Sequence, residues 1–354
     1  MIELDWNRIT VMVVDDNTFM RRLMASMLNA FGVKTVIQES ECSSAIERLR
    51  LSRTDPIEAK LGEMDLILSD YVMPGIDGNL FLRWVRTGEG TPNRFVPFIL
   101  VSGAASRFVV EEARNAGVSA VLAKPFSVNS MAERILWVVN STNDFILARQ
   151  YFGPNRRRMS VPVNVERRGA GHDDIQIVKP TSKVRTLRDD VRAIHFLPDN
   201  RLRSKLGVGS SQEIVEFDPL VLRAAEARIQ DMLGDYVDWV AKYLDDMRAS
   251  MAAIKVGPKP IPENRAPVGN IGRIAYQLFC QSETFGYPLI TQFGESLYKA
   301  TSHPDLVVSG NTLKLIEAHI DAISSVFRNH VDGDGGKVGE KLLANLARAV
   351  AKYT

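Results

Sequence analysis

Short apolar runs alternate with amphipathic patterns over the first 142 residues of this chain. The runs have the length of strands and are bounded by turn residues, which is typical of buried strands in a parallel sheet. They lie at residues 9–14, 33–38, 66–68, 96–101 and 120–123. Apolar residues at three- and four-residue steps predict helices at 18–31, 43–51, 79–86, 108–116 and 128–139. This alternation predicts an α/β fold with a doubly wound parallel sheet.

Helical spacing dominates from Asp218 to the end of the chain. One apolar stripe beginning at Asp218-Pro219, an N-cap followed by proline, predicts a single helix of roughly 35 residues. Further helices are expected at 268–283, 288–300, 311–330 and 337–352. The segments between them are rich in glycine and proline. The pattern predicts an antiparallel all-α helical bundle over residues 216–354.

The middle of the chain, residues 143–215, shows neither the apolar runs typical of strands nor the three- and four-residue spacing typical of helices. Arginine clusters at 156–158 and 167–168 lie among Gly, Pro, Asn and Ser, and residues 143–213 carry 14 basic and 8 acidic side chains, a net charge of +6. A segment with so little apolar content does not offset its ordering entropy. We expect a basic linker, partly disordered, that packs locally through Tyr151, Phe152 and Phe196.

Composition excludes several classes of protein. No apolar run approaches the ~18 residues of a membrane span, and no secretory signal peptide is evident at the N-terminus. Cys42 and Cys280 lie too far apart in sequence to suggest a disulfide framework or a cysteine metal site. We therefore expect a cytoplasmic protein. Basic clusters in the linker are able to bind nucleic-acid phosphates, but residues 214–354 have a net charge of −2 and no helix-turn-helix pattern, which argues against nucleic acid as a partner.

Polar residues follow four of the predicted strands. Asp15 and Asp16 follow the first, Asp70 the third, Ser102 the fourth and Lys124 the fifth. Because open α/β sheets bind ligands at the carboxyl ends of their strands, these side chains should line one crevice. Three clustered carboxylates repel and require a divalent cation, and Mg²⁺ commonly shares its shell with a phosphoryl group.

The same set suits phosphoryl transfer, which needs mainly positioning and charge neutralisation. Lys124 can neutralise phosphoryl oxygens and Ser102 can donate a hydrogen bond to one of them. Asp70, central and directly ahead of the turn containing Pro74 and Gly75, is the natural nucleophile. Aspartyl phosphate is a known type of covalent intermediate.

The motifs DD, D-x-x-M-P-G-x-D-G, S-G and K-P-F occur in this order at residues 15, 70, 102 and 124. Residues 1–142 thereby resemble the receiver domain of bacterial two-component response regulators. The resemblance implies a flavodoxin-like sheet of five strands in the order 2-1-3-4-5. It implies that Asp15, Asp16, Asp70 and the backbone carbonyl of Val72 hold Mg²⁺. It also implies that Asp70 accepts the phosphoryl group, Ser102 is the switch hydroxyl and Lys124 binds the phosphoryl group.

Three positions depart from the receiver pattern. Val121 stands where receivers often carry an aromatic switch residue, and Phe108 is an alternative source of that ring. Val72 and Ala104 are apolar at positions where polar residues influence hydrolysis of the phosphorylated form. We therefore expect a long-lived phosphorylated state.

A second motif lies in the predicted bundle. Residues 274–286 resemble the H-x-L-K-G signature of histidine phosphotransfer domains, with Tyr276, Phe279 and Cys280 at the positions of His, Lys and Gly. Tyrosine cannot replace imidazole as a reversible phosphoramidate former, so the resemblance implies a degenerate, pseudo-phosphotransfer domain. An unrelated helical bundle remains the alternative. His319 is the histidine through which a relay would have to run.

These patterns lead to one expectation of function. Phosphorylation of Asp70 by a sensor histidine kinase or a phosphotransfer protein would switch the contacts of the C-terminal helices with an unknown downstream protein, with a homodimer as a further option. We expect a signalling protein and not an enzyme. An active phosphorelay transferase and a nucleic-acid-binding regulator are the alternative functions.

Overall fold

The computed structural model describes residues 4–54, 64–103, 107–141, 144–155, 175–178, 193–208, 214–303, 306–329, 331 and 333–353. Within them the chain forms two compact units. The first comprises residues 1–123 and 128–228, and the second comprises residues 124–127 and 229–354. No helix among the described residues is long and apolar enough to cross a bilayer.

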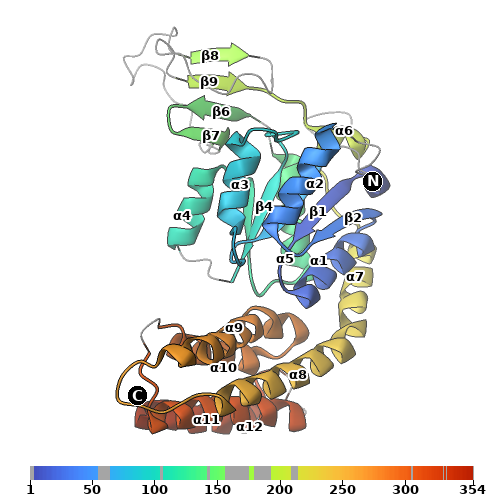
Figure 1. The fold of residues 1–354 in the computed structure, drawn as a ribbon. Helices are drawn as coiled ribbons and strands as arrows, with labels where there is room; N and C mark the ends of the chain where they lie inside the picture. The colour runs from blue at the N-terminus through green and yellow to red at the C-terminus, as the bar shows by residue number, and fades with distance from the viewer. Residues whose placement is uncertain are drawn as a thin grey trace, which may run out of the picture. The chain divides into compact units, whose positions relative to one another are not determined.

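A parallel five-stranded sheet forms the centre of the first unit (Figure 1). Its strands are β1 Thr10–Val14, β2 Thr35–Glu39, β3 Leu66–Asp70, β4 Phe98–Ser102 and β5 Ala120–Ala123. The strand order is β2-β1-β3-β4-β5, which confirms the predicted doubly wound fold. Every residue of β3 and β4 is buried, as expected for central strands covered on both faces.

Five helices flank this sheet. They are α1 Thr18–Ala30, α2 Cys42–Thr54, α3 Gly78–Thr87, α4 Arg107–Ala116 and α5 Val128–Asn140. Met12 and Val14 pack in one cluster with buried residues of α2, α3 and α4. Since side chains alternate across a strand, the buried Val11 and Val13 face the opposite side. There α1 contacts β1 and β2, and α5 contacts β5.

A second sheet, of four strands, follows the parallel one in sequence. Its strands are β6 Phe145–Ala148, β7 Tyr151–Pro154, β8 Ile175–Val178 and β9 Ala193–Phe196, in the order β7-β6-β9-β8. The prediction of a linker over residues 143–215 is therefore wrong for the described part of that segment. Phe152 and Phe196 do pack locally, in a cluster with Phe145 and with Phe95 of the loop before β4. Strands of four residues are too short to show a period, which is why the sequence pattern missed them.

Two buried arginines join this sheet to the five-stranded one. Arg86 of α3 is fully buried and donates hydrogen bonds to the carbonyls of Gly117, Arg94 and Val96 at 2.8, 2.9 and 2.7 Å. Its guanidinium lies 5.4 Å from the centroid of the Phe145 ring. Burial lowers the pKa of Arg86 to about 9, so it is still charged at neutral pH. Arg94 places its guanidinium 3.9 Å from the Phe152 ring centroid, a cation–π contact.

Residues 200–208 and 214–217 then contact the first unit. They include α6, Arg201–Lys205, whose Lys205 forms a 2.6 Å ion pair with the buried carboxylate of Asp65. Phe217 stacks on Trp6 at 4.8 Å between ring centroids and lies 4.7 Å from Phe31. We call residues 200–208 and 214–217 the return segment. Its contacts fix the start of α7 to the first unit.

The remaining helices are α7 Pro219–Asp231, α8 Leu233–Ala252, α9 Arg265–Gln281, α10 Pro288–Thr301, α11 Gly310–Arg328 and α12 Gly336–Tyr353. The single helix predicted from Asp218 is thus two, because a turn at Met232 interrupts it. Short 3-10 segments, η4 Pro262–Asn264 and η5 Ser282–Phe285, precede and follow α9. Within the second unit α8, α9, α10 and α11 contact one another as a closed ring, and α12 packs on α11. This arrangement agrees with the predicted helical bundle.

Candidate functional site

Three carboxylates meet at the carboxyl ends of β1 and β3. Asp15 directly follows β1, Asp16 comes next, and Asp70 is the last residue of β3. Each offers an oxygen, and these oxygens all lie within 4.8 Å of one another. Asp15 and Asp70 are buried and Asp16 is half-buried. The structure therefore brings together the three aspartates that the strand pattern placed in one crevice.

The start of α1 holds Asp15, the first of these residues, in place. The backbone N–H of Asn17 donates to Oδ1 of Asp15 at 2.9 Å, while the Asn17 side chain caps α1 by accepting from the Met20 N–H at 3.0 Å. Arg21, one turn into the helix, donates to the Asp15 carbonyl at 2.6 Å. The strand-to-helix turn is thus hydrogen-bonded on both sides of the acidic pair.

The turn after Asp70 explains the glycines of the D-x-x-M-P-G-x-D-G motif. Gly75 has φ +76°, a conformation that side chains with a Cβ rarely adopt. A Cβ at Gly78 would lie 2.0 Å from the Asp70 carbonyl oxygen, so only glycine fits where α3 begins. Asp77 caps that helix by accepting from the Leu80 N–H at 2.7 Å. The backbone around the proposed phosphoacceptor is therefore closely packed.

Ser102 ends β4, and Lys124 directly follows β5. Ser102 is fully buried at the end of β4, and its partner in the register is Ala123, the last residue of β5. Lys124 follows at once, is 7% exposed and is joined to Pro125 by a cis peptide bond. Val72, whose carbonyl is a predicted metal ligand, is 49% exposed in the loop after β3.

The donor set fits magnesium. Each of the three aspartates supplies a carboxylate oxygen, the hard ligand that Mg²⁺ prefers, and three negative charges this close repel strongly without a cation. Cys42 also lies buried in this region, where burial and the charges of Asp77 and Asp70 raise the pKa of its thiol to about 12. A thiol that stays protonated at neutral pH does not compete as a ligand.

A hydrogen bond that the sequence did not reveal is made by Tyr71, the residue after Asp70. The Tyr71 hydroxyl donates to Oε2 of Glu112 on α4 at 2.8 Å. Burial and this carboxylate raise the pKa of Tyr71 to about 12. Of the two positions considered for an aromatic switch, Val121 is partly buried and Phe108 is 66% exposed on α4. Ala104, the other apolar position near the site, lies outside the described residues.

The residues proposed for a relay lie in the second unit. Tyr276 of α9 is half-buried, with its ring centroid 5.1 Å from that of Tyr298 and 6.3 Å from that of Phe279, and Cys280 is buried. His319 of α11 is fully buried. Its Nδ1 lies 2.7 Å from the Leu315 carbonyl and its Nε2 lies 2.9 Å from Oγ of Ser296.

These two bonds define the state of the imidazole of His319. A carbonyl only accepts, so Nδ1 carries the proton and Nε2 accepts from the Ser296 hydroxyl. Burial lowers the pKa of His319, which favours this neutral form. The ring is thus a satisfied core group with no exposed nitrogen, which a phosphoacceptor would require.

Comparison with known proteins agrees with the geometry of the first unit. Residues 11–136 match the response regulator receiver domain family. A probable chemotaxis protein CheY of Rhizobium etli is 30% identical over 128 residues, which are 36% of this chain and 90% of that protein. The polar-differentiation response regulator DivK of Brucella ovis is 30% identical over 126 residues, which are 36% of this chain and 92% of that protein.

A solved structure gives a further match. The receiver domain of the histidine kinase CKI1 from Arabidopsis thaliana, complexed with Mg²⁺ and BeF₃⁻, is 28% identical, and the alignment covers 37% of this chain and 94% of that one with a TM-score of 0.31. The family match ends at residue 136, and the phosphotransfer resemblance of the C-terminal helices stays a prediction. The matched range contains Asp15, Asp16, Asp70, Ser102 and Lys124. Through this part of its sequence the chain belongs to the response regulator receiver family, as a two-component response regulator.

Proposed function

We propose that Mg²⁺-dependent phosphorylation of Asp70 switches protein–protein contacts made by the C-terminal helices. The observation that carries this proposal is the meeting of Asp15, Asp16 and Asp70 with oxygens within 4.8 Å of one another. Three carboxylates this close repel one another, and a divalent cation bound among them would remove that repulsion. The partner that delivers the phosphoryl group would be a sensor histidine kinase or a phosphotransfer protein.

Each residue has a role in that reaction. A carboxylate oxygen of Asp70 forms a bond to phosphorus while the bond from phosphorus to the donor atom breaks. Asp15, Asp16 and the Val72 carbonyl would complete the Mg²⁺ site, and the ion would supply charge neutralisation for the transferred group. Lys124 would pair with a phosphoryl oxygen, and Ser102 would donate its hydroxyl to another.

The C-terminal part would act as a docking module and not as a relay. Tyr276 stands where the phosphotransfer signature has histidine, and its ring packs against Tyr298. His319 is buried with both ring nitrogens in hydrogen bonds. A phosphoryl group adds about −1.5 to −2 charges, enough to bias a two-state element by a few kcal/mol.

The test is labelling of the full chain. With acetyl phosphate and Mg²⁺, the wild type should acquire one acid-stable, base-labile phosphoryl group, and Asp70→Asn should acquire none. Asp77→Asn is the matched control, because asparagine also caps a helix and the neighbouring carboxylate is outside the cluster. Equal labelling of the Asp70 variant and the wild type would contradict the proposal.

A second measurement tests the downstream half. Beryllofluoride with Mg²⁺ should change hydrogen exchange in the helices of residues 229–353 in the wild type but not in Asp70→Asn. If exchange changes only in residues 4–141, the receiver responds without switching the C-terminal helices, and that half of the proposal fails.

A further inference from the structure

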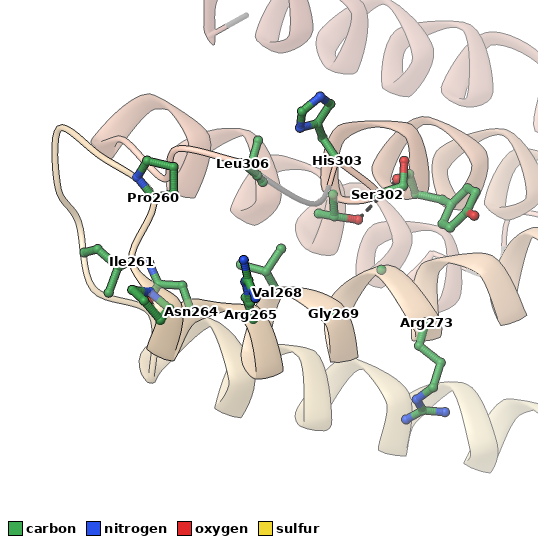
Figure 2. A pocket seen from close by; sticks show the side chains of 14 residues that line it. Pro260, Ile261, Asn264, Arg265, Val268, Gly269, Arg273, Ser302, His303 and Leu306 are labelled. Carbon is green, nitrogen blue, oxygen red and sulfur yellow. Dashed lines mark hydrogen bonds between the residues drawn. The ribbon is translucent and has the colours of Figure 1, made fainter. Parts of the chain in front are cut away.

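A cavity of about 570 Å³ lies within the second unit, between the first half of α9, the end of α10 and the loop that follows α10 (Figure 2). The loop between α8 and η4 closes one end with Pro260 and Ile261. Small-molecule sites commonly have volumes of about 300–1,000 Å³. The cavity is therefore large enough for a ligand of some twenty non-hydrogen atoms.

Glycines on α9 explain why this space exists. At Gly272 the two helices touch, because a Cβ there would lie 3.0 Å from Oγ1 of Thr301. One turn nearer the start of α9, a Cβ at Gly269 would meet no atom within 4 Å. Gly269 lines the cavity and contributes no side chain to fill it. The helices thus pack tightly at one glycine and leave a space at the other.

The walls combine apolar surface with an exposed cation at the rim of the cavity. Ile261, Val268 and Leu306 supply apolar surface, and Tyr298 adds an aromatic ring. Arg265 at the start of α9 directs its guanidinium into the gap between the helix and the loop (Figure 2). Arg273 turns away from the gap and donates to Asn270 and Gln277 of its own helix.

The charge of the cavity favours an anion. No acidic residue occurs among the described residues that line it. Arg265 lies in the first turn of α9, where the helix dipole adds positive potential. A guanidinium forms strong charge-assisted hydrogen bonds to carboxylate, sulfonate and phosphate oxygens.

We propose that this cavity binds a small amphipathic anion, with its charged group on Arg265 and its apolar body over Gly269 against Val268, Ile261 and Leu306. The charged group can be a carboxylate, sulfonate or phosphate. The described residues that line the site come from η4, α9, α10 and the adjoining loops of the second unit, so binding there does not require the phosphorylation of Asp70. It would give the C-terminal helices a small-molecule input of their own.

Two fluorescent probes test the proposal on the full chain. One is 8-anilinonaphthalene-1-sulfonate, an aromatic anion, and the other is N-phenyl-1-naphthylamine, its uncharged counterpart. The wild type should bind both at one site per chain. Arg265→Gln should weaken binding of the sulfonate about tenfold, the loss of one charge-assisted contact, and leave the amine unchanged.

A second variant tests the location. Gly269→Met should abolish binding of both probes, because its side chain would extend into the cavity, and methionine is a better helix former than glycine, so the variant should remain folded. Gly234→Met is the matched control, since Gly234 is another exposed helical glycine with no atom within 4 Å of a Cβ, on α8 and away from the cavity. It should bind both probes as the wild type does.

Decanoate, a natural type of amphipathic anion, should displace the sulfonate from the wild type. Three results would overturn the inference: no saturable binding by the wild type, unchanged binding by Gly269→Met, or equal weakening of both probes by Arg265→Gln. The first two would remove the site, and the third would remove its selectivity for anions.

Discussion

Replacing Arg86 by methionine should destabilise the first unit severely. The side chain is fully buried, and it donates to three backbone carbonyls at 2.7 to 2.9 Å. Methionine fits the volume of the aliphatic stem but supplies no donor. The carbonyls of Gly117, Arg94 and Val96 would then be left buried and unsatisfied.

The magnitude follows from those bonds. Each unsatisfied buried acceptor costs about 1–3 kcal/mol, which sums to an upper range of about 3–9 kcal/mol. Removal of the buried charge offsets part of this cost, because burial disfavours the charged form of Arg86, as its lowered pKa of about 9 indicates. The returned desolvation energy places the expected loss in the lower half of that range. We therefore expect a loss of about 3–5 kcal/mol in the free energy of unfolding of the first unit.

Urea denaturation followed by tryptophan fluorescence measures this loss, and hydrogen exchange locates it. Protection should fall in residues 144–155 and 193–196, which pack on Arg86 and Arg94. Arg83→Met is the matched control, since Arg83 is exposed on the same helix and its loss should change stability by less than about 0.5 kcal/mol. A loss below about 1 kcal/mol for Arg86→Met would refute the reasoning that these hydrogen bonds anchor the four-stranded sheet.

Three further predictions concern the aspartate site and the bundle. Asp16→Ala, or chelation of Mg²⁺, should abolish labelling of Asp70, and full labelling under chelation would exclude the metal role. Val72→Asn combined with Ala104→Glu should shorten the lifetime of the phosphorylated form, because these polar groups can orient an attacking water; an unchanged decay would show that the apolar residues do not set the lifetime. Because the pKa of His319 is lowered in the folded protein, the unfolded chain binds a proton at this residue more readily than the folded chain does. The contribution of neutral His319 to the free energy of unfolding is therefore fully present above about pH 6.5 and is lost as the pH falls below that value. Thermal melts between pH 7 and 5 should show a steeper loss for the wild type than for His319→Gln, and parallel curves would contradict this linkage.

The receiver sheet and its three aspartates could be predicted because their signals are local. Four of the five strands, β1, β3, β4 and β5, are mainly apolar, and the polar residue that ends or follows each of them is fixed at the edge of the sheet by the strand itself. Asp15, Asp16 and Asp70 therefore meet without any long-range information beyond the strand order. The glycine and proline turn after Asp70 is equally local, since Gly78 is required by the backbone it contacts.

What the sequence pattern missed depends on contacts between distant residues. The four-stranded sheet is anchored by Arg86 and Arg94, and arginine in an amphipathic helix or a loop normally indicates an exposed surface. Tyr71 and Glu112 are 41 positions apart, and no period relates them. The burial of His319 likewise depends on Ser296, on a different helix. The turn at Met232 interrupts a helix whose apolar stripe continues through it, so spacing alone could not reveal the break.

The return segment has a consequence for how receivers can be exchanged between proteins. Phe217 stacks on Trp6 and packs against Phe31, and Lys205 neutralises the buried Asp65. A fragment cut at residue 142, the boundary expected from the receiver pattern, would expose both aromatic rings and leave a buried carboxylate without its cation. Recombination that transplants this receiver onto another output domain would therefore have to carry the chain through Phe217. The segment that must be transferred intact is longer than the receiver domain that would be phosphorylated.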